Sequence, residues 1–335
     1  MTTVTIPYNL DPISISQFSL ELHALPEEDE YTFDFGGRRH FPPFSMLLLS
    51  SVLRHFRDER PASRRRATNH DQHSYPAYMG FYRSFGLAHG NLPGGAAGTE
   101  NCIPITDIDV PSIRQQAIAN FQEVGDLVEE KASQLAHMLT QNTRGPLADT
   151  LTYSIREIMR NVVEHSQSDT IHICAQYWPT RNEVEVGIAD DGIGVHAALT
   201  SNPAHSGLDE KEAIEFALMP GISGNPNAGR GHNVWNNSGY GLYMTSRICR
   251  NGGCFLISSG GHGLQLDQNG KTNFETKFKG TAIRLFLNTA NLGELSGRLR
   301  AFADEGREAA RTLNGANINR ASTASQMLRR DFQNA

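Results

Sequence analysis

One predicted helix in this 335-residue chain carries a polar stripe beside an apolar face. Its apolar side chains recur at helical spacing within residues 147–166: Leu151, Ile155, Ile158, Met159, Val162 and Val163. Glu157, Asn161 and His165 follow at intervals of four, drifting by about 40° per step around the helix. A solvated surface explains such a stripe when it stands alone. On a core-facing helix the stripe instead faces something polar, where Glu157 could position water and Asn161 could bind Mg²⁺.

An acidic, glycine-containing turn follows a predicted strand in the same half of the chain. Asp190-Asp191-Gly192-Ile193-Gly194 comes directly after the strand predicted over residues 183–188. An acid at a strand end can accept a hydrogen bond from an exocyclic amine such as that of adenine. The two glycines would let a ligand approach the backbone closely. A plain Asp-Gly turn has the same sequence, and on its own it is the simpler interpretation.

Glycines also open a helix predicted over residues 239–249. In Ser238-Gly239-Tyr240-Gly241-Leu242 they would expose backbone N–H groups at the positive end of the helix dipole, which suits phosphate. Residues 195–238 predict a long loop, serving either as a mobile lid or as a flexible linker. Its candidate lid residues are Gly221, Gly224, Gly229, Arg230 and Gly231. Gly280-Thr281 stands at the start of the last predicted core strand, over residues 281–287. By itself this dipeptide does not indicate a function.

In this order, the four elements resemble the N, G1, G2 and G3 boxes of the GHKL ATPase superfamily, which includes DNA gyrase, the heat-shock chaperone, histidine kinases and the mismatch-repair ATPases. The resemblance covers roughly residues 140–290. It implies a Bergerat fold, an α/β sandwich that holds ATP between helices and a mixed sheet. It also implies that Glu157 is the general base, Asn161 the Mg²⁺ ligand and Asp190 the acceptor for the adenine amine. The other nucleotide-binding positions that it implies are His165, Gly192, Gly194, Gly239, Tyr240, Gly241, Leu242 and Thr281.

The histidine eight residues after Glu157 makes the stripe more similar to bacterial anti-sigma-factor serine kinases than to gyrase. Near the N-terminus, Phe33-Asp34-Phe35-Gly36-Gly37 before a leucine-rich helix is similar to STAS domains, the usual partners and substrates of those kinases. STAS substrates carry a phosphorylatable serine at the start of that helix. This chain has Pro42 and Pro43 there, and Ser45 is nearby but not aligned.

These patterns predict an α/β protein in four parts: a STAS-like domain over residues 1–95, a linker and connecting helix over 96–140, a GHKL ATP-binding domain over 141–290, and a C-terminal helix with a polar tail over 291–335. In the first part we expect strands at 3–8 and 31–35 and helices at 14–25 and 44–56. Two stretches mark the boundary after this first part, and both are predicted to be surface loops. They are the polar residues 54–73, including Arg64-Arg65-Arg66, and the Gly/Pro-rich residues 90–98.

The remaining elements follow from periodicity. Residues 112–141 predict one long helix, or two broken near Gly125, and this is the candidate interface of a homodimer. A helix packed within its own chain has the same pattern. Strands at 170–177 and 183–188 alternate as half-buried strands do, and a further strand is expected at 253–258. A terminal helix is predicted at 292–313, and the last 20 residues are expected to be frayed.

Composition excludes several classes of protein. The net charge of -6 gives no reason to expect a nucleic-acid partner. The most apolar stretch, residues 41–53, is interrupted by prolines and serines and is too short to span a bilayer, and the N-terminus lacks the pattern of a signal peptide. The four cysteines have no metal-ligand spacing. We therefore expect a cytoplasmic protein without a membrane partner.

The leading functional prediction is slow, Mg²⁺-dependent ATP hydrolysis coupled to a conformational or partner switch. Residues 195–238 would order over the γ-phosphate, so that the ATP and ADP states present different surfaces to a protein partner. A serine/threonine kinase of the anti-sigma type is the alternative, in which Glu157 takes a proton from a serine hydroxyl of a STAS protein. The third interpretation is a nucleotide-gated binding module that scarcely turns over.

Overall fold

The first part of the chain forms a small parallel sheet. The computed structural model describes residues 1–335 apart from 38–39, 97, 227–237, 314–315, 318–320 and 333–335. Three strands lie in sequence order and pair in parallel: β1 (Thr2–Thr5), β2 (Glu30–Asp34) and β3 (Arg64–Thr68). Between them run α1 (Pro12–His23), which the Asp11 carboxylate caps, and α2 (Pro43–Glu59), which begins at a proline.

The second part forms a five-stranded sheet of order β4-β5-β6-β8-β7, in which every pairing is antiparallel. Its strands are β4 (Cys102–Asp109), β5 (Thr170–Trp178), β6 (Glu183–Asp190), β7 (Cys254–Asp267) and β8 (Gly270–Asn288). The chain is therefore α/β, as predicted. The expectation of a mixed sheet in this part is wrong, because short turns join β5 to β6 and β7 to β8 as hairpins.

Helices pack against both sheets. Those not yet given are α3 (Ser74–Tyr78), α4 (Phe81–Ser84), α5 (Val110–Ala119), α6 (Val124–Thr140), α7 (Pro146–Asn161), α8 (Gly194–Thr200), α9 (Glu210–Ala217), α10 (Gly241–Cys249), α11 (Leu295–Ala310), α12 (Thr323–Gln326) and α13 (Arg329–Phe332). A π-helical turn, η2 (Val162–Ser166), continues α7. Short 3-10 turns lie at His70–Gln72, Pro179–Arg181, Pro203–His205 and Thr289–Asn291. None of the helices in the described part of the chain has both the length and the apolar character needed to cross a membrane.

One predicted surface loop and the predicted linker each contain a strand instead. Residues 64–68 form β3, whose backbone pairs with β2 while its arginines alternate between the two faces. The stretch predicted as linker and connecting helix, residues 96–140, contains β4, which pairs with β5. Pro104 hid this strand from the sequence analysis, since proline cannot donate to a sheet. The structure accommodates it because β4 is an edge strand with an irregular register between Ile103 and Thr106.

Several other predicted segments have different bounds or breaks in the structure. Residues 112–141 form two helices, α5 and α6, and the residues between them include Phe121, which is 98% exposed. The apolar face of α6 packs in the core of its own chain, the alternative to a dimer interface that the pattern left open. The predicted loop at 195–238 contains α8 and α9, and strands β7 and β8 extend well beyond the predicted 253–258 and 281–287.

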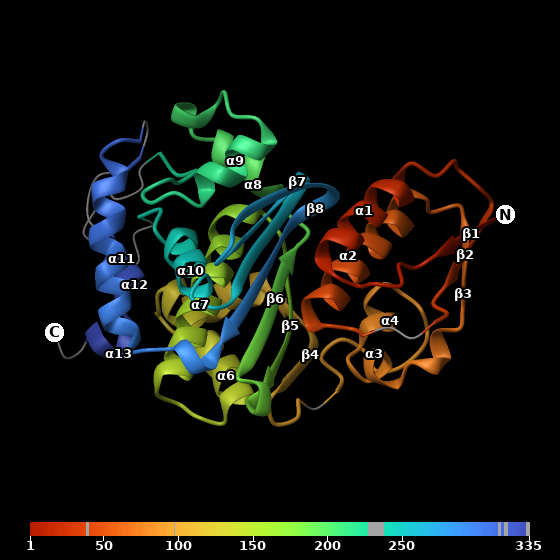
Figure 1. The fold of residues 1–335 in the computed structure, drawn as a ribbon, viewed down its shortest axis with the longest axis horizontal. Helices are drawn as coiled ribbons and strands as arrows, with labels where there is room; N and C mark the ends of the chain where they lie inside the picture. Colours follow the sequence, from red (N-terminus) through yellow and green to blue (C-terminus); the bar gives the residue numbers. More distant parts are fainter. Residues whose placement is uncertain (38–39, 97, 227–237, 314–315, 318–320, 333–335) are drawn as a thin grey trace.

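Helices cover both faces of the antiparallel sheet (Figure 1). One core lies between the sheet and helices α6, α7 and α10, and a second joins the sheet to α1 and α2. The prediction that β5 and β6 are half-buried is wrong, because α2 covers their second face and leaves both strands buried along most of their length. The two α/β parts of the chain are therefore packed against each other through α1 and α2.

Gly187 allows α2 to approach the sheet closely. A Cβ atom at this position of β6 would lie 3.0 Å from Phe44 Cα and 3.3 Å from Leu47 Cδ2. We expect Gly187→Val to lower the free energy of unfolding by about 1–3 kcal/mol, because the added methyl groups overpack this contact. Urea unfolding would measure the change. Gly207→Val is the matched control, since a Cβ there meets nothing within 4 Å, and an equal effect of both substitutions would contradict the packing explanation.

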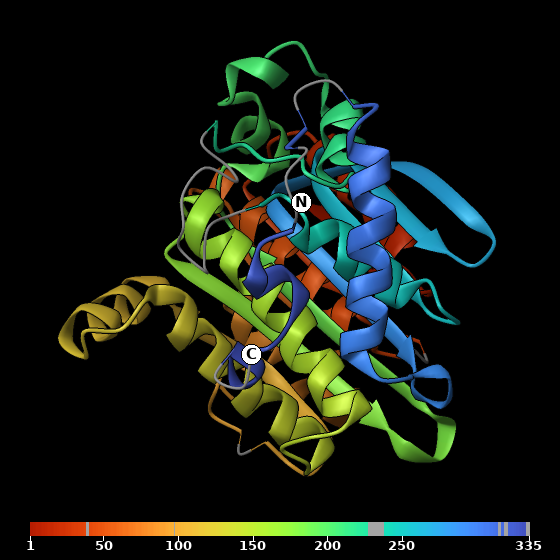
Figure 2. The same ribbon diagram turned by 90° about the vertical axis from the view of Figure 1, so that its left-hand side faces the viewer.

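The last residues of the chain are not frayed as predicted, at least over residues 321–332. Helices α12 and α13 lie against α6 and α7 (Figure 2) and bury Ala324 and Leu328. The Tyr153 hydroxyl donates a hydrogen bond to the carbonyl of Ser325 at 2.8 Å. The segment was missed because its attachment depends on backbone carbonyls and small side chains, which leave no periodic apolar pattern in the sequence.

Candidate functional site

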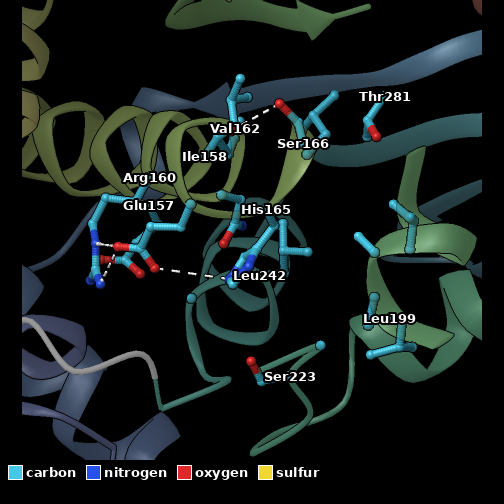
Figure 3. A pocket seen from close by; sticks show the side chains of 18 of the residues that line it. Glu157, Ile158, Arg160, Val162, His165, Ser166, Leu199, Ser223, Leu242 and Thr281 are labelled. Carbon is cyan, nitrogen blue, oxygen red and sulfur yellow. Dashed lines mark hydrogen bonds and ion pairs between the residues drawn. The ribbon is translucent and has the colours of Figure 1, made fainter. Parts of the chain in front are cut away.

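The polar stripe of α7 and η2 lines a pocket. The pocket lies among α7, the turn after β6, α8 and the start of α10, and its volume is about 1000 Å³ including the part open to solvent. Figure 3 shows Glu157, His165 and Leu242 around this space, with Leu199 and Thr281 on its other sides. Of the eleven residues selected from the sequence, nine line the pocket: Glu157, Asn161, His165, Asp190, Gly194, Gly239, Gly241, Leu242 and Thr281.

The other two selected residues support the pocket from behind. The Gly192 N–H donates to Asp190 Oδ1 at 2.8 Å. A Cβ at Gly192 would lie 2.0 Å from the carbonyl oxygen of Ser166, so only glycine lets this turn approach η2. Tyr240 precedes α10 and is fully buried, with its ring edge-on to Tyr243 in the core. It therefore contributes to the packing of α10 and does not line the pocket.

Asp190 lies at the end of β6, opposite Thr281 of β8. Its side chain is buried within the pocket wall, and this burial raises the pKa of its carboxyl group to about 7, while the Gly192 N–H opposes the shift. The negative charge of Asp191 adds to the increase. Asp190 is therefore a hydrogen-bond acceptor on both oxygens above pH 7 and gains a proton as the pH falls below 7. An amine donor on a ligand would bind the ionised form.

Glu157 is held by a buried arginine. Its Oε1 accepts hydrogen bonds from Arg156 Nη2 at 2.8 Å and Nε at 3.1 Å. Arg156 is fully buried and also donates to Glu129 Oε2 at 2.6 Å and to the carbonyls of Ala324 and Met327. Burial alone would lower the pKa of Arg156, but the two carboxylates raise it above its usual value. Sequence reasoning missed this contact because Arg156 has the spacing of an ordinary core-side residue.

The second oxygen of Glu157 lies beside the start of α10. A Cβ at Gly241 would come within 2.4 Å of Glu157 Oε2, so glycine is needed for this approach. At Gly239 the backbone φ is +75°, and a Cβ would lie 2.5 Å from the carbonyl oxygen of Ile222. Because Gly241 and Leu242 line the pocket, the positive end of the α10 dipole faces it. This end of the pocket suits an anion.

Asn161 and His165 complete the stripe. The Nδ2 atom of Asn161 is buried and has no hydrogen-bond partner among the described residues. An open NH₂ donor can bind an acceptor such as a phosphate oxygen, whereas the predicted Mg²⁺ ligand would be the side-chain carbonyl oxygen of the same amide. The described residues contain no cluster of three or more His, Cys, Asp or Glu that could hold a metal, but Mg²⁺ is commonly bound through one or two side chains together with phosphates. Burial lowers the pKa of His165, so its imidazole is neutral at pH 7.

Several pocket residues were not predicted. Ala198 and Leu199 come from α8, Ile222 and Ser223 from the segment before α10, and Ser325 from α12. No local sequence pattern marks them, since each reaches the pocket through long-range packing. The described part of the predicted lid is packed, because a Cβ at Gly224 would lie 2.2 Å from the carbonyl oxygen of Ala198. Gly229, Arg230 and Gly231 lie outside the described residues.

No model of a known protein family matches the chain, and a search of curated proteins gave no match. The function is therefore inferred from the pocket and from the sequence elements that line it.

Proposed function

We propose that the pocket binds Mg²⁺-ATP and that the protein is a GHKL-type ATPase with slow turnover. One observation carries the proposal: sequence elements that are far apart in the chain, each chosen for one part of a nucleotide, line a single pocket. In this interpretation the antiparallel sheet with α6, α7 and α10 is a Bergerat-type sandwich. The three parallel strands with α1 and α2 are a STAS-like domain.

The two ends of the pocket suit the two ends of ATP. Asp190 provides a buried acceptor for the adenine amine, and the start of α10 provides a positive end for phosphate. Between them the wall is apolar and fits the faces of a purine ring, with side chains Ile158, Ile188, Val195, Leu199, Ile257 and Ile283.

In the proposed reaction, Glu157 orients and deprotonates a water molecule near the γ-phosphate. Only its Oε2 is available for this, because Arg156 occupies Oε1. Asn161 would hold Mg²⁺, and the metal, when bound, would neutralise negative charge on the phosphate oxygens.

The contact between Arg156 and Glu157 also favours a second candidate, a nucleotide-gated binding module that does not hydrolyse ATP. A carboxylate that serves mainly as the partner of a buried arginine has a structural role. In that case the nucleotide would act by its presence in the pocket, and the protein partner would respond to occupied and empty states.

Glu157→Gln should separate these candidates. We expect the unchanged protein, given Mg²⁺ and ATP labelled on the γ-phosphate, to release labelled phosphate, and we expect Glu157→Gln to reduce that rate by about 10²–10⁴-fold while ATP still binds. Glu130→Gln, at an exposed position of α6, is the control and should leave the rate unchanged.

Each other outcome has a distinct meaning. Label transferred to protein would indicate the serine/threonine kinase that the sequence left open. Binding of ATP with no turnover in either form would indicate the binding module. Absence of ATP binding by the unchanged protein would overturn the proposal.

A further inference from the structure

A cluster of charged side chains lies directly behind the pocket. Asp191 follows Asp190 in the chain, but it faces α2 and does not line the pocket. Arg54 Nη2 donates to both oxygens of Asp191, at 2.8 and 2.9 Å, and His55 Nε2 lies 3.1 Å from Oδ1. Arg54 and His55 both belong to α2, so the first part of the chain contacts the turn that carries Asp190.

The five-stranded sheet supplies the rest of the cluster. His172 of β5 places Nε2 3.2 Å from Asp191 Oδ2 and Nδ1 2.6 Å from Asp107 Oδ1 of β4. Burial alone would lower the pKa of His172, but hydrogen bonds to these two acids raise it. Burial would likewise raise the pKa of Asp191, but His172, His55 and Arg54 hold it well below the usual range. Asp191 therefore remains a carboxylate.

We infer that Arg54 and His55 are positioning residues of the nucleotide site: by binding Asp191 they hold the turn of residues 190–194 and make nucleotide affinity depend on the first part of the chain. The inference rests on the proposed function. Neither residue lines the pocket, so neither would touch the nucleotide. Both act through Asp191, the residue next to Asp190 in the chain.

The physical route is geometric and electrostatic. The turn is fixed on its other side by the Ile193 N–H, which donates to the carbonyl of Ser166 at 2.8 Å, and α2 holds the side chain of Asp191. Without Arg54, the charge of Asp191 would act on Asp190 with less compensation. Asp190 would then gain its proton at a higher pH and lose its ability to accept a hydrogen bond from the ligand amine.

The test is the affinity for Mg²⁺-ATP, measured by calorimetry on the full chain between pH 5.5 and 8.5. For the unchanged protein we expect affinity to fall as the pH drops through about 7, because the ionised form of Asp190 is the one that binds. Arg54→Gln should raise the midpoint of this fall by about one pH unit, which is about a fivefold loss of affinity at pH 7. Arg57→Gln, on the same helix but paired with Asp58, is the matched control and should leave the midpoint unchanged.

A second substitution distinguishes this role from simple loss of packing. Adding Asp191→Asn to Arg54→Gln removes the uncompensated charge and should return the midpoint to the original value or below. Asp191→Asn alone should lower the midpoint, and this single variant tests the same route if Arg54→Gln does not fold. Arg54→Lys should keep the original midpoint.

The outcomes separate the inference from the function on which it rests. If the unchanged protein does not bind Mg²⁺-ATP, both the proposed function and the positioning role are overturned. If it binds, but Arg54→Gln has the same pH profile as Arg57→Gln, only the positioning role is overturned. A shifted midpoint that Asp191→Asn fails to reverse would also overturn it, because packing would then explain the shift.

Discussion

Asp190→Asn should reduce the affinity for ATP by at least about 100-fold. In the folded protein, Oδ1 of Asp190 accepts from the Gly192 N–H at 2.8 Å. An asparagine would use its only oxygen for that bond and would turn its NH₂ group toward the ligand amine. The loss of a charge-assisted hydrogen bond and the burial of two opposed donors together cost about 3 kcal/mol or more, and each 1.4 kcal/mol is a factor of about ten.

Calorimetry at pH 8, where Asp190 is ionised, would give the largest contrast. Asp304→Asn, on the exposed side of α11, is the matched control and should bind ATP as the unchanged protein does. The fold should survive Asp190→Asn, because an amide fills the buried site without a charge. Affinity within threefold of the original would contradict the assignment of Asp190 as the adenine acceptor.

Arg156→Met should lower the free energy of unfolding by about 3–5 kcal/mol, a large part of the total stability of an ordinary domain. The substitution keeps an unbranched apolar stem but removes the cation between Glu129 and Glu157, which are both buried. It also leaves the carbonyls of Ala324 and Met327 without their donor. Breaking one side of a buried ion pair costs more than the pair itself contributes.

Urea unfolding would measure this loss, and limited proteolysis with trypsin at Arg329 and Arg330 would report the release of the C-terminal segment. Arg247→Met is the matched control, since Arg247 pairs with Glu305 at the surface and should contribute about 1 kcal/mol or less. Adding Glu129→Gln and Glu157→Gln to Arg156→Met should recover part of the loss, because no buried charge then remains unpaired. A change below 1 kcal/mol in Arg156→Met would contradict the central role of this arginine.

The elements with strong periodicity were predicted from sequence within a few residues at each end. Helix α7 is one, because its apolar positions recur at helical spacing. Helix α10 was also located, but from the glycines at its start and not from periodicity. Strands β5 and β6 were located correctly, but their second buried face was not foreseen. Burial of that face depends on α2, and an alternating pattern cannot show which element covers a strand's polar side.

Most of the residues selected from the sequence line the pocket, but the contacts that hold them were not foreseen. Glu157 and Asp190 were selected for their positions at a helix face and a strand end. Arg156 binds Glu157, Arg54 binds Asp191 beside Asp190, and Ser325 lines the pocket. The local sequence at these three positions carries no ligand-like pattern. Their roles arise from packing between distant segments, which a reading of local spacing does not capture.

The most direct test of the account is a crystal structure of the full chain with Mg²⁺ and a non-hydrolysable ATP analogue. We expect the adenine amine within hydrogen-bond distance of the Asp190 carboxylate, and the phosphates beside Gly239 and Gly241 at the start of α10. An analogue bound elsewhere on the molecule, or bound in this pocket with its base away from Asp190, would contradict the account.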